Sequence, residues 1–153
     1  MTFETNATAN ELLNELLIRL HRSLVQYVLD AWLWSTPEAV PLKGALLTLL
    51  ERQREDVGLL ANLLTQRRHA IDFGTYPMEF TRVNYLAVEF LFSKLCDHQH
   101  SLVKSFEQAV GNLDDDPQGK EIVQVIAKSQ KKGLDQLWNV DLPGSGSETV
   151  WMK

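Results

Sequence analysis

Residues 46–64 decide the fold, and their sequence is LLTLLERQREDVGLLANLL. Leucines recur in this stretch every three or four residues, which is the spacing that places them on one face of an α-helix. Gln53 and Asp56 interrupt that face near its middle, at positions where the period would put apolar residues. The stretch therefore predicts a long helix whose buried face contains a polar break.

The same period predicts three further helices along the chain. With the stretch above, this gives four expected helices. They cover about residues 8–34, about 80–110 and about 117–138, and the one that contains residues 46–64 starts between 37 and 41 and ends at about 69. Thr8 and Glu11 have the spacing of a capping box at the start of the first helix. Asp116 and Pro117 predict the start of the last helix, because Asp is a favoured N-cap and Pro suits the first helical position.

The connections predict how these helices are arranged. Short turns join the first helix to the second and the third to the fourth, so each pair is expected to be an antiparallel hairpin. Between the hairpins lie residues 70–79, which could reach about 33 Å if fully extended. A crossover of that length joining two hairpins is the connectivity of ferritin-like folds, whereas a compact turn here would give a plain up-down bundle.

The sequence therefore predicts an all-α protein, an antiparallel four-helix bundle with two helical hairpins joined by one crossover at about 70–79. Residues 1–140 are expected to form a single domain. Residues 141–153 contain Pro-Gly-Ser-Gly-Ser and are interpreted as a flexible C-terminal tail.

Composition and charge narrow the possible functions. The net charge of −5 argues against a nucleic-acid partner, which needs a concentrated positive surface. The basic pairs Arg67-Arg68 and Lys131-Lys132 are interpreted as solvated. The N-terminus has no signal-peptide pattern and no apolar run is as long as a membrane span, so we expect a cytoplasmic protein with no membrane partner. Cys96 stands alone and is interpreted as a small packing residue.

A dinuclear metal site in such a bundle requires a particular ligand pattern. One Glu comes from each of two helices and a Glu-x-x-His pair from each of the other two, all pointing inward. Residues 53–56 (Gln-Arg-Glu-Asp) have this spacing, with Gln in place of Glu and Asp in place of His. Residues 130–133 (Gln-Lys-Lys-Gly) have it again, with Gln and Gly at those places. Leu20 and Asp97 lie 33 residues before the two glutamines, so the hairpins repeat each other.

With these motifs the chain resembles the ferritin-like superfamily, in particular the bacterioferritin and rubrerythrin type of bundle, over roughly residues 10–138. Residues 26–31 look like the stretch that follows the first ligand in bacterioferritin-like first helices. Residues 126–135 look like the last ligand helix of that family, with other residues in place of its acidic residues and its histidine. The resemblance implies ligand positions at Leu20, Gln53, Asp56, Asp97, Gln130 and Gly133.

Most of these positions hold residues that are unsuited to bind iron. Two have no donor side chain and two are neutral amides, which are poor iron ligands. Only Asp56 and Asp97 could donate a carboxylate. We therefore expect no working di-iron centre, no catalytic residue and no cofactor. The residual metal candidates are Asp56, Asp97 and His98.

Instead of a metal, the interior is expected to hold a hydrogen-bonded polar layer. A buried carboxylate needs a donor, and glutamine amides and an imidazole supply donors. His98 fits the apolar stripe between Leu95 and Leu102 better than Asp97 does. The predicted layer consists of Gln53, Asp56, His98 and Gln130.

The favoured function is that of a ferritin-like bundle without a working di-iron centre, acting as a structural or binding module. A homodimer is expected, with Trp32, Trp34 and Trp151 as candidate contact residues.

Two alternatives remain open. The first is a divergent oxidoreductase or metal-storage-related protein that binds iron, manganese or zinc through Asp56, Asp97 or His98. The second is a pocket for a small ligand of unknown identity in the space that a metal would fill, because Gly133 opposite Leu20 would leave room there.

Overall fold

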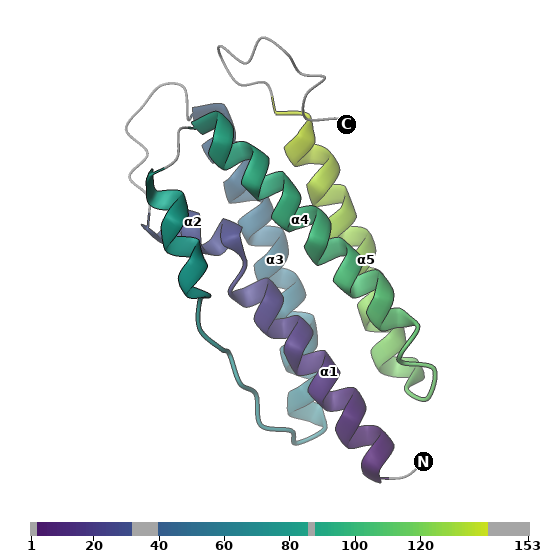
Figure 1. The fold of residues 1–153 in the computed structure, drawn as a ribbon. Coiled ribbons are helices and arrows are strands. Elements are labelled where there is room, and N and C mark those ends of the chain that lie inside the picture. The colour runs from purple at the N-terminus through teal and green to yellow at the C-terminus, as the bar shows by residue number, and fades with distance from the viewer. Residues whose placement is uncertain (1–2, 32–39, 86–87, 141–153) are drawn as a thin grey trace.

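The computed structural model describes residues 3–31, 40–85 and 88–140, and these residues are helical with connecting turns (Figure 1). No strand occurs within these ranges, so the predicted all-α class is confirmed for the part of the chain that is described. The predicted tail and the three candidate contact tryptophans lie outside it. In chain order the elements are α1 (Phe3–His21), α2 (Leu24–Ala31), α3 (Val40–Gln66), the 3₁₀ helix η2 (Met78–Tyr85), α4 (Val88–Val110) and α5 (Pro117–Trp138).

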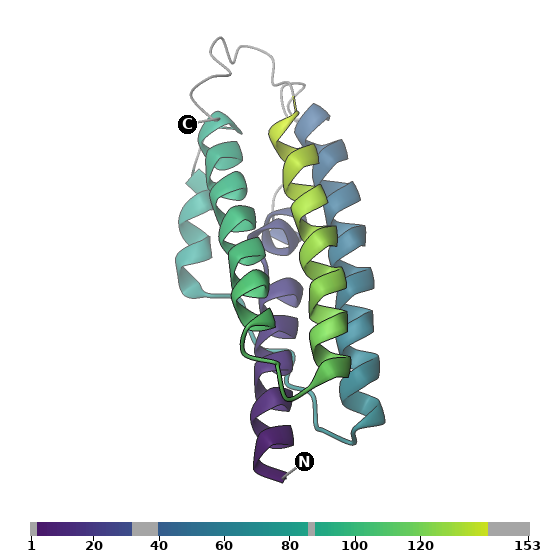
Figure 2. The same cartoon turned by 90° about the vertical axis from the view of Figure 1, so that its right-hand side faces the viewer.

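The four long helices lie side by side, and the short α2 turns across them (Figures 1 and 2). The colour along the ribbon shows that α1 and α5 run in one direction and that α3 and α4 run in the other. α1 packs on α3 and α4, and α5 packs on α3 and α4. Each long helix therefore contacts two others, which leaves a shared interior between all four.

Two apolar clusters fill this interior. One gathers around α2, the first half of α3 and the first half of α4, and it includes Leu46 and Phe92. The other gathers around α1, the second half of α3 and the second half of α4, and it includes Leu17 and Phe106. Along α3 the buried polar residues Gln53 and Asp56 lie between the two clusters. The core is thus apolar at both ends and polar in between.

The predicted first helix over residues 8–34 is wrong as a single element. α1 already begins at Phe3, so Thr8 lies inside a helix and does not cap one. The helix ends at His21, and a second one begins at Leu24. Ser23 is the physical reason, because its hydroxyl accepts a hydrogen bond from the backbone N–H of Gln26 at 3.3 Å, as an N-cap does.

The predicted third helix over 80–110 is also divided, into η2 and α4. α5 agrees with its prediction: Asp116 is its N-cap and accepts a hydrogen bond from the backbone N–H of Gly119, with Pro117 next in the chain.

The segment between α3 and η2 follows α1 instead of forming a compact turn (Figure 1). The side-chain amide of Asn14 donates to Asp72 O at 3.1 Å, and its oxygen accepts from the Asp72 N–H at 3.0 Å. Arg22 Nε donates to Gly74 O at 3.1 Å. Gly74 has a left-handed φ of 68°, and a Cβ there would lie 2.6 Å from Ile18 Cγ2. The close approach to α1 thus requires glycine at this position.

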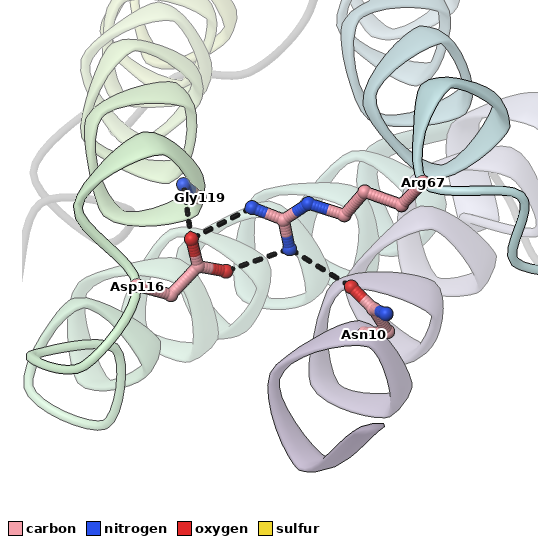
Figure 3. A network of polar contacts seen from close by, with 4 residues as sticks. All are labelled: Asn10, Arg67, Asp116 and Gly119. Carbon is pink, nitrogen blue, oxygen red and sulfur yellow. Dashed lines mark hydrogen bonds and ion pairs between the residues drawn. The ribbon is translucent and has the colours of Figure 1, made fainter. Parts of the chain in front are cut away.

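Arg67, interpreted from the sequence as solvated, is instead part of a polar network between three elements (Figure 3). Its guanidinium donates to both carboxylate oxygens of Asp116, at 2.8 and 2.7 Å, and to Asn10 Oδ1 at 2.8 Å. The side chain of Arg67 is 19 % exposed and that of Asp116 is 3 % exposed. The interpretation holds for its neighbour Arg68 and for the pair Lys131-Lys132, which are exposed.

Candidate functional site

Gln53 is the centre of the polar layer between the two apolar clusters. It lies in the middle of α3 and is fully buried. Its Oε1 accepts a hydrogen bond from the Ser23 hydroxyl at 2.7 Å and another from Gln26 Nε2 at 3.1 Å. Ser23 therefore both caps α2 and ties the break between α1 and α2 to α3.

The other end of the Gln53 side chain contacts α4 and α5. Gln53 Nε2 donates to Gln99 Oε1 at 3.1 Å and to Gln130 Oε1 at 3.4 Å. Gln99 Nε2 donates to the backbone oxygen and to Oε1 of Gln130, both at 3.0 Å. Gln130 Nε2 donates to Asp56 Oδ2 at 2.7 Å. The layer therefore joins α3, α4 and α5.

The hydrogen bonds of the layer have a common direction. The Ser23 hydroxyl donates to the first amide, the amides donate to one another, and the last amide donates to the carboxylate of Asp56. An ionised carboxylate only accepts hydrogen bonds, so it is a natural end for such a chain. Bonds that are aligned in this way polarise one another and hold the buried side chains in one arrangement.

Asp56 is the single buried carboxylate of the layer, and its environment is unfavourable for charge. Burial raises the pKa of Asp56 above its ordinary value. Hydrogen bonds from Gln130 and Ser129 and the positive charge of Arg52 act in the opposite direction but do not cancel the effect. Arg52 is itself poorly satisfied, since its buried Nε has no hydrogen-bond partner among the described residues.

The prediction that His98 belongs to the layer is wrong, and Gln99 occupies that place. His98 packs against Phe80 instead, with 5.4 Å between the ring centroids. Asp97 is exposed, so it does not share an interior site with Asp56. Sequence reasoning missed Gln99, although its position four residues after Leu95 and three before Leu102 was a signal as good as that of His98.

The remaining ligand positions of the ferritin-like pattern are filled by apolar packing. Leu20 is fully buried within the cluster around α1. At Gly133 an added Cβ would lie 2.5 Å from Leu49 Cδ1 and 3.4 Å from Arg52 Cδ. The space that was expected opposite Leu20 is therefore occupied by side chains of α3.

The donor set of the layer does not fit a di-iron centre. It offers one carboxylate, Asp56, and four neutral amides, whereas such a centre needs bridging carboxylates and imidazoles. Within residues 3–31, 40–85 and 88–140, no group of three or more His, Cys, Asp or Glu side chains could hold a metal ion. Cys96 is buried, and burial raises the pKa of its thiol to about 12, so it stays protonated.

Comparison of the chain with protein-family models, with curated proteins and with solved structures finds no match. None of the described helices combines the length and the apolar character needed to cross a membrane.

Proposed function

We propose that this chain is a ferritin-like antiparallel four-helix bundle with an amide layer in place of a di-iron centre, and that it acts as a structural or binding module. The helix directions support two antiparallel hairpins, α1 with α3 and α4 with α5. The segment that follows α1 between α3 and η2 supports a crossover between them. Two hairpins and one crossover are the connectivity of ferritin-like bundles.

One observation carries the proposal: the amides of Gln53 and Gln130 both have their hydrogen-bond partners within the layer. The ferritin-like pattern would have metal-binding glutamates at these two positions. Here Gln53 Nε2 lies 3.4 Å from Gln130 Oε1, and Gln130 Nε2 bonds to Asp56. Amides that hydrogen-bond one another already have their partners, so the layer stabilises the bundle interior without an ion.

The experiment that tests the proposal is metal analysis of the full chain. Protein purified without chelator is analysed for iron, manganese and zinc, before and after anaerobic loading with each ion. We expect substoichiometric metal in every sample and no increase in melting temperature on loading, because an ion that binds the folded state would raise it.

The divergent metal-binding oxidoreductase makes the opposite prediction. Stoichiometric metal that is lost in Asp56→Asn but kept in Asp97→Asn would contradict our proposal and support that alternative. Asp97 is the matched control, because it is the same residue type and is exposed on α4.

We also propose that the protein forms a homodimer through apolar surface. Leu47 on α3 is 44 % exposed and Val125 on α5 is 51 % exposed, and α3 and α5 pack side by side. Size-exclusion chromatography with light scattering measures the mass in solution. A strictly monomeric species at high concentration would contradict the dimer.

A further inference from the structure

A cavity lies away from the amide layer, between α1, α4 and the start of η2. Its volume is about 220 Å³. Ile18, Phe80 and Leu102 form an apolar wall. That volume corresponds to roughly seven water molecules at about 30 Å³ each, so it suits a small organic molecule.

Two arginines at the end of α1 line the same cavity. Arg22 is held in place, because its Nε donates to Phe73 O and Gly74 O and its guanidinium lies 5.0 Å from the centre of the Tyr76 ring. Both of those hydrogen bonds come from Nε. The two terminal nitrogens of Arg22 have no hydrogen bond to a described residue. Arg19 likewise has no hydrogen bond or ion pair with the described part of the chain. The cavity therefore offers one fixed guanidinium, that of Arg22, and a second, exposed one, that of Arg19, beside an apolar wall.

The charges that line the cavity select a singly charged anion. Arg19 and Arg22 contribute two positive charges, and Glu79 contributes one negative charge. His98 also lines the cavity, and burial together with the charge of Arg19 lowers its pKa to about 4, so it is neutral at pH 7. The lining thus carries one net positive charge. A monoanion neutralises it, whereas a phosphate dianion would leave excess negative charge beside Glu79.

We propose that this cavity binds a small monocarboxylate whose carboxylate pairs with Arg19 and Arg22 and whose apolar body packs on Ile18, Phe80 and Leu102. Guanidinium groups bind carboxylates with well-defined geometry. The apolar wall then distinguishes such a ligand from acetate or an inorganic anion, which would leave the wall exposed to water.

The inference rests on the binding role proposed above and gives it a site and a ligand class. The cavity and the layer around Gln53 are different places in the molecule. Metal at Asp56 would contradict the proposed function and leave the cavity result unaffected. Failure of ligand binding would leave the metal result unaffected.

The test is a titration of the full chain with benzoate, followed by ¹H–¹⁵N NMR. We expect saturable shifts at the amides of Arg19, Phe80 and Ser101, with a dissociation constant on the order of 1 mM for a ligand of this size. Hexanoate should bind comparably, and acetate and inorganic phosphate at least about tenfold more weakly, because they lack the apolar contacts.

Arg19→Gln is the informative variant, because the side chain is exposed and its loss leaves no described partner unpaired. Benzoate affinity should fall about tenfold in this variant, as expected for the loss of a hydrogen bond to a charged group. Arg54→Gln is the matched control, since Arg54 is an exposed arginine on α3 that lies away from the cavity.

Three outcomes would overturn the assignment. They are the absence of saturable shifts, an equal loss of affinity in the two arginine variants, and binding of phosphate as strong as that of benzoate. In the last case the arginines would form a general anion site without the carboxylate specificity proposed here.

Discussion

The imidazole of His98 is held in an environment that opposes its protonation. The ring packs edge to face on Phe80, and burial with the nearby charge of Arg19 lowers its pKa to about 4. In the unfolded chain a histidine titrates near 6.5. Between these two values the unfolded state binds more protons than the folded state. Stability therefore falls as the pH drops through this window.

We predict that His98→Gln removes much of the acid sensitivity of the protein. The wild-type chain should lose roughly 2 kcal/mol of stability from this group between pH 7 and pH 5, and the variant should not. Urea unfolding at the two pH values measures the effect. His100→Gln is the control, because His100 is exposed on the same helix. The explanation is wrong if the two variants show the same pH dependence.

Asp56 titrates with the opposite sign. Its pKa is raised by burial, so above its ordinary value of 3.8 the folded state holds the proton more tightly than the unfolded state does. Stability from this group is therefore greatest at low pH and decreases as the pH rises through the folded pKa. Wherever it is ionised, the buried carboxylate is a cost to the fold, which the hydrogen bond from Gln130 reduces.

We predict that Asp56→Asn is more stable than the wild-type chain at pH 7. The asparagine oxygen can still accept the Gln130 bond, but it carries no charge to be desolvated. The difference should shrink as the pH falls toward 3.8. Chemical unfolding at pH 7 and pH 4 measures it, with Asp97→Asn as the exposed control. A variant less stable than the wild-type chain at pH 7 would show that the charge interaction with Arg52 dominates.

The residues of the layer could be predicted only in part from the sequence. Gln53, Asp56 and Gln130 interrupt apolar stripes, and the structure brings all three together in the interior. The choice between His98 and Gln99 could not be made, because both fit between Leu95 and Leu102. One residue is a rotation of about 100° around a helix. The packing of α4 on α5 decides that rotation. The apolar stripe of α4 alone does not give this information.

At the scale of elements, helix ends with local chemical signals were the predictable ones. The N-cap Asp116 with Pro117 determines the start of α5 within a few residues of chain. The break after His21 has a weaker local signal, because Ser23 caps α2 through the Gln26 N–H while the apolar period continues across the break. A long-range contact adds to it: the Ser23 hydroxyl reaches Gln53, thirty positions away in the sequence, at 2.7 Å. The contact of the segment between α3 and η2 with α1 through Asn14 is non-local in the same way.

We predict opposite effects for two helical glycines. An added Cβ at Gly58 in α3 would meet no atom within 4 Å, so Gly58→Ala should stabilise the protein by about 0.5–1 kcal/mol through helix propensity. At Gly133 in α5 the Cβ would lie 2.5 Å from the buried Leu49 side chain. Overpacking there should exceed the propensity gain and destabilise by about 1 kcal/mol. Thermal unfolding compares the two, and equal signs would contradict this packing argument.

For the whole molecule, the interior divides into two apolar clusters separated by the amide layer. Each cluster contains side chains from α3 and α4, so neither half is complete without the same long helices. The layer specifies how these helices align, because a shift along the axis would bury unpaired amides against leucines at a cost of several kcal/mol. The amides thus favour one register of the long helices, and this effect does not require a bound ion.

The network of Asn10, Arg67 and Asp116 closes one end of the molecule, where α1, the end of α3 and the start of α5 meet (Figure 3). Asp116→Ala removes an N-cap and leaves the partly buried Arg67 without its carboxylate. We predict a loss of about 3 kcal/mol of stability at pH 7. Asp114→Ala is the matched control: its pair with Lys120 is exposed, so the cost should stay below about 1 kcal/mol.

The pH dependence of this network gives an independent check. Hydrogen bonds from Arg67 lower the pKa of Asp116, so its contribution is present above the ordinary value of 3.8 and is lost as the pH falls through the lower folded value. The difference between the wild-type chain and Asp116→Ala should therefore persist at pH 5 and decrease only in stronger acid. Urea unfolding across this range measures it, and equal costs for Asp114→Ala and Asp116→Ala at pH 7 would show that the three elements do not depend on this connection.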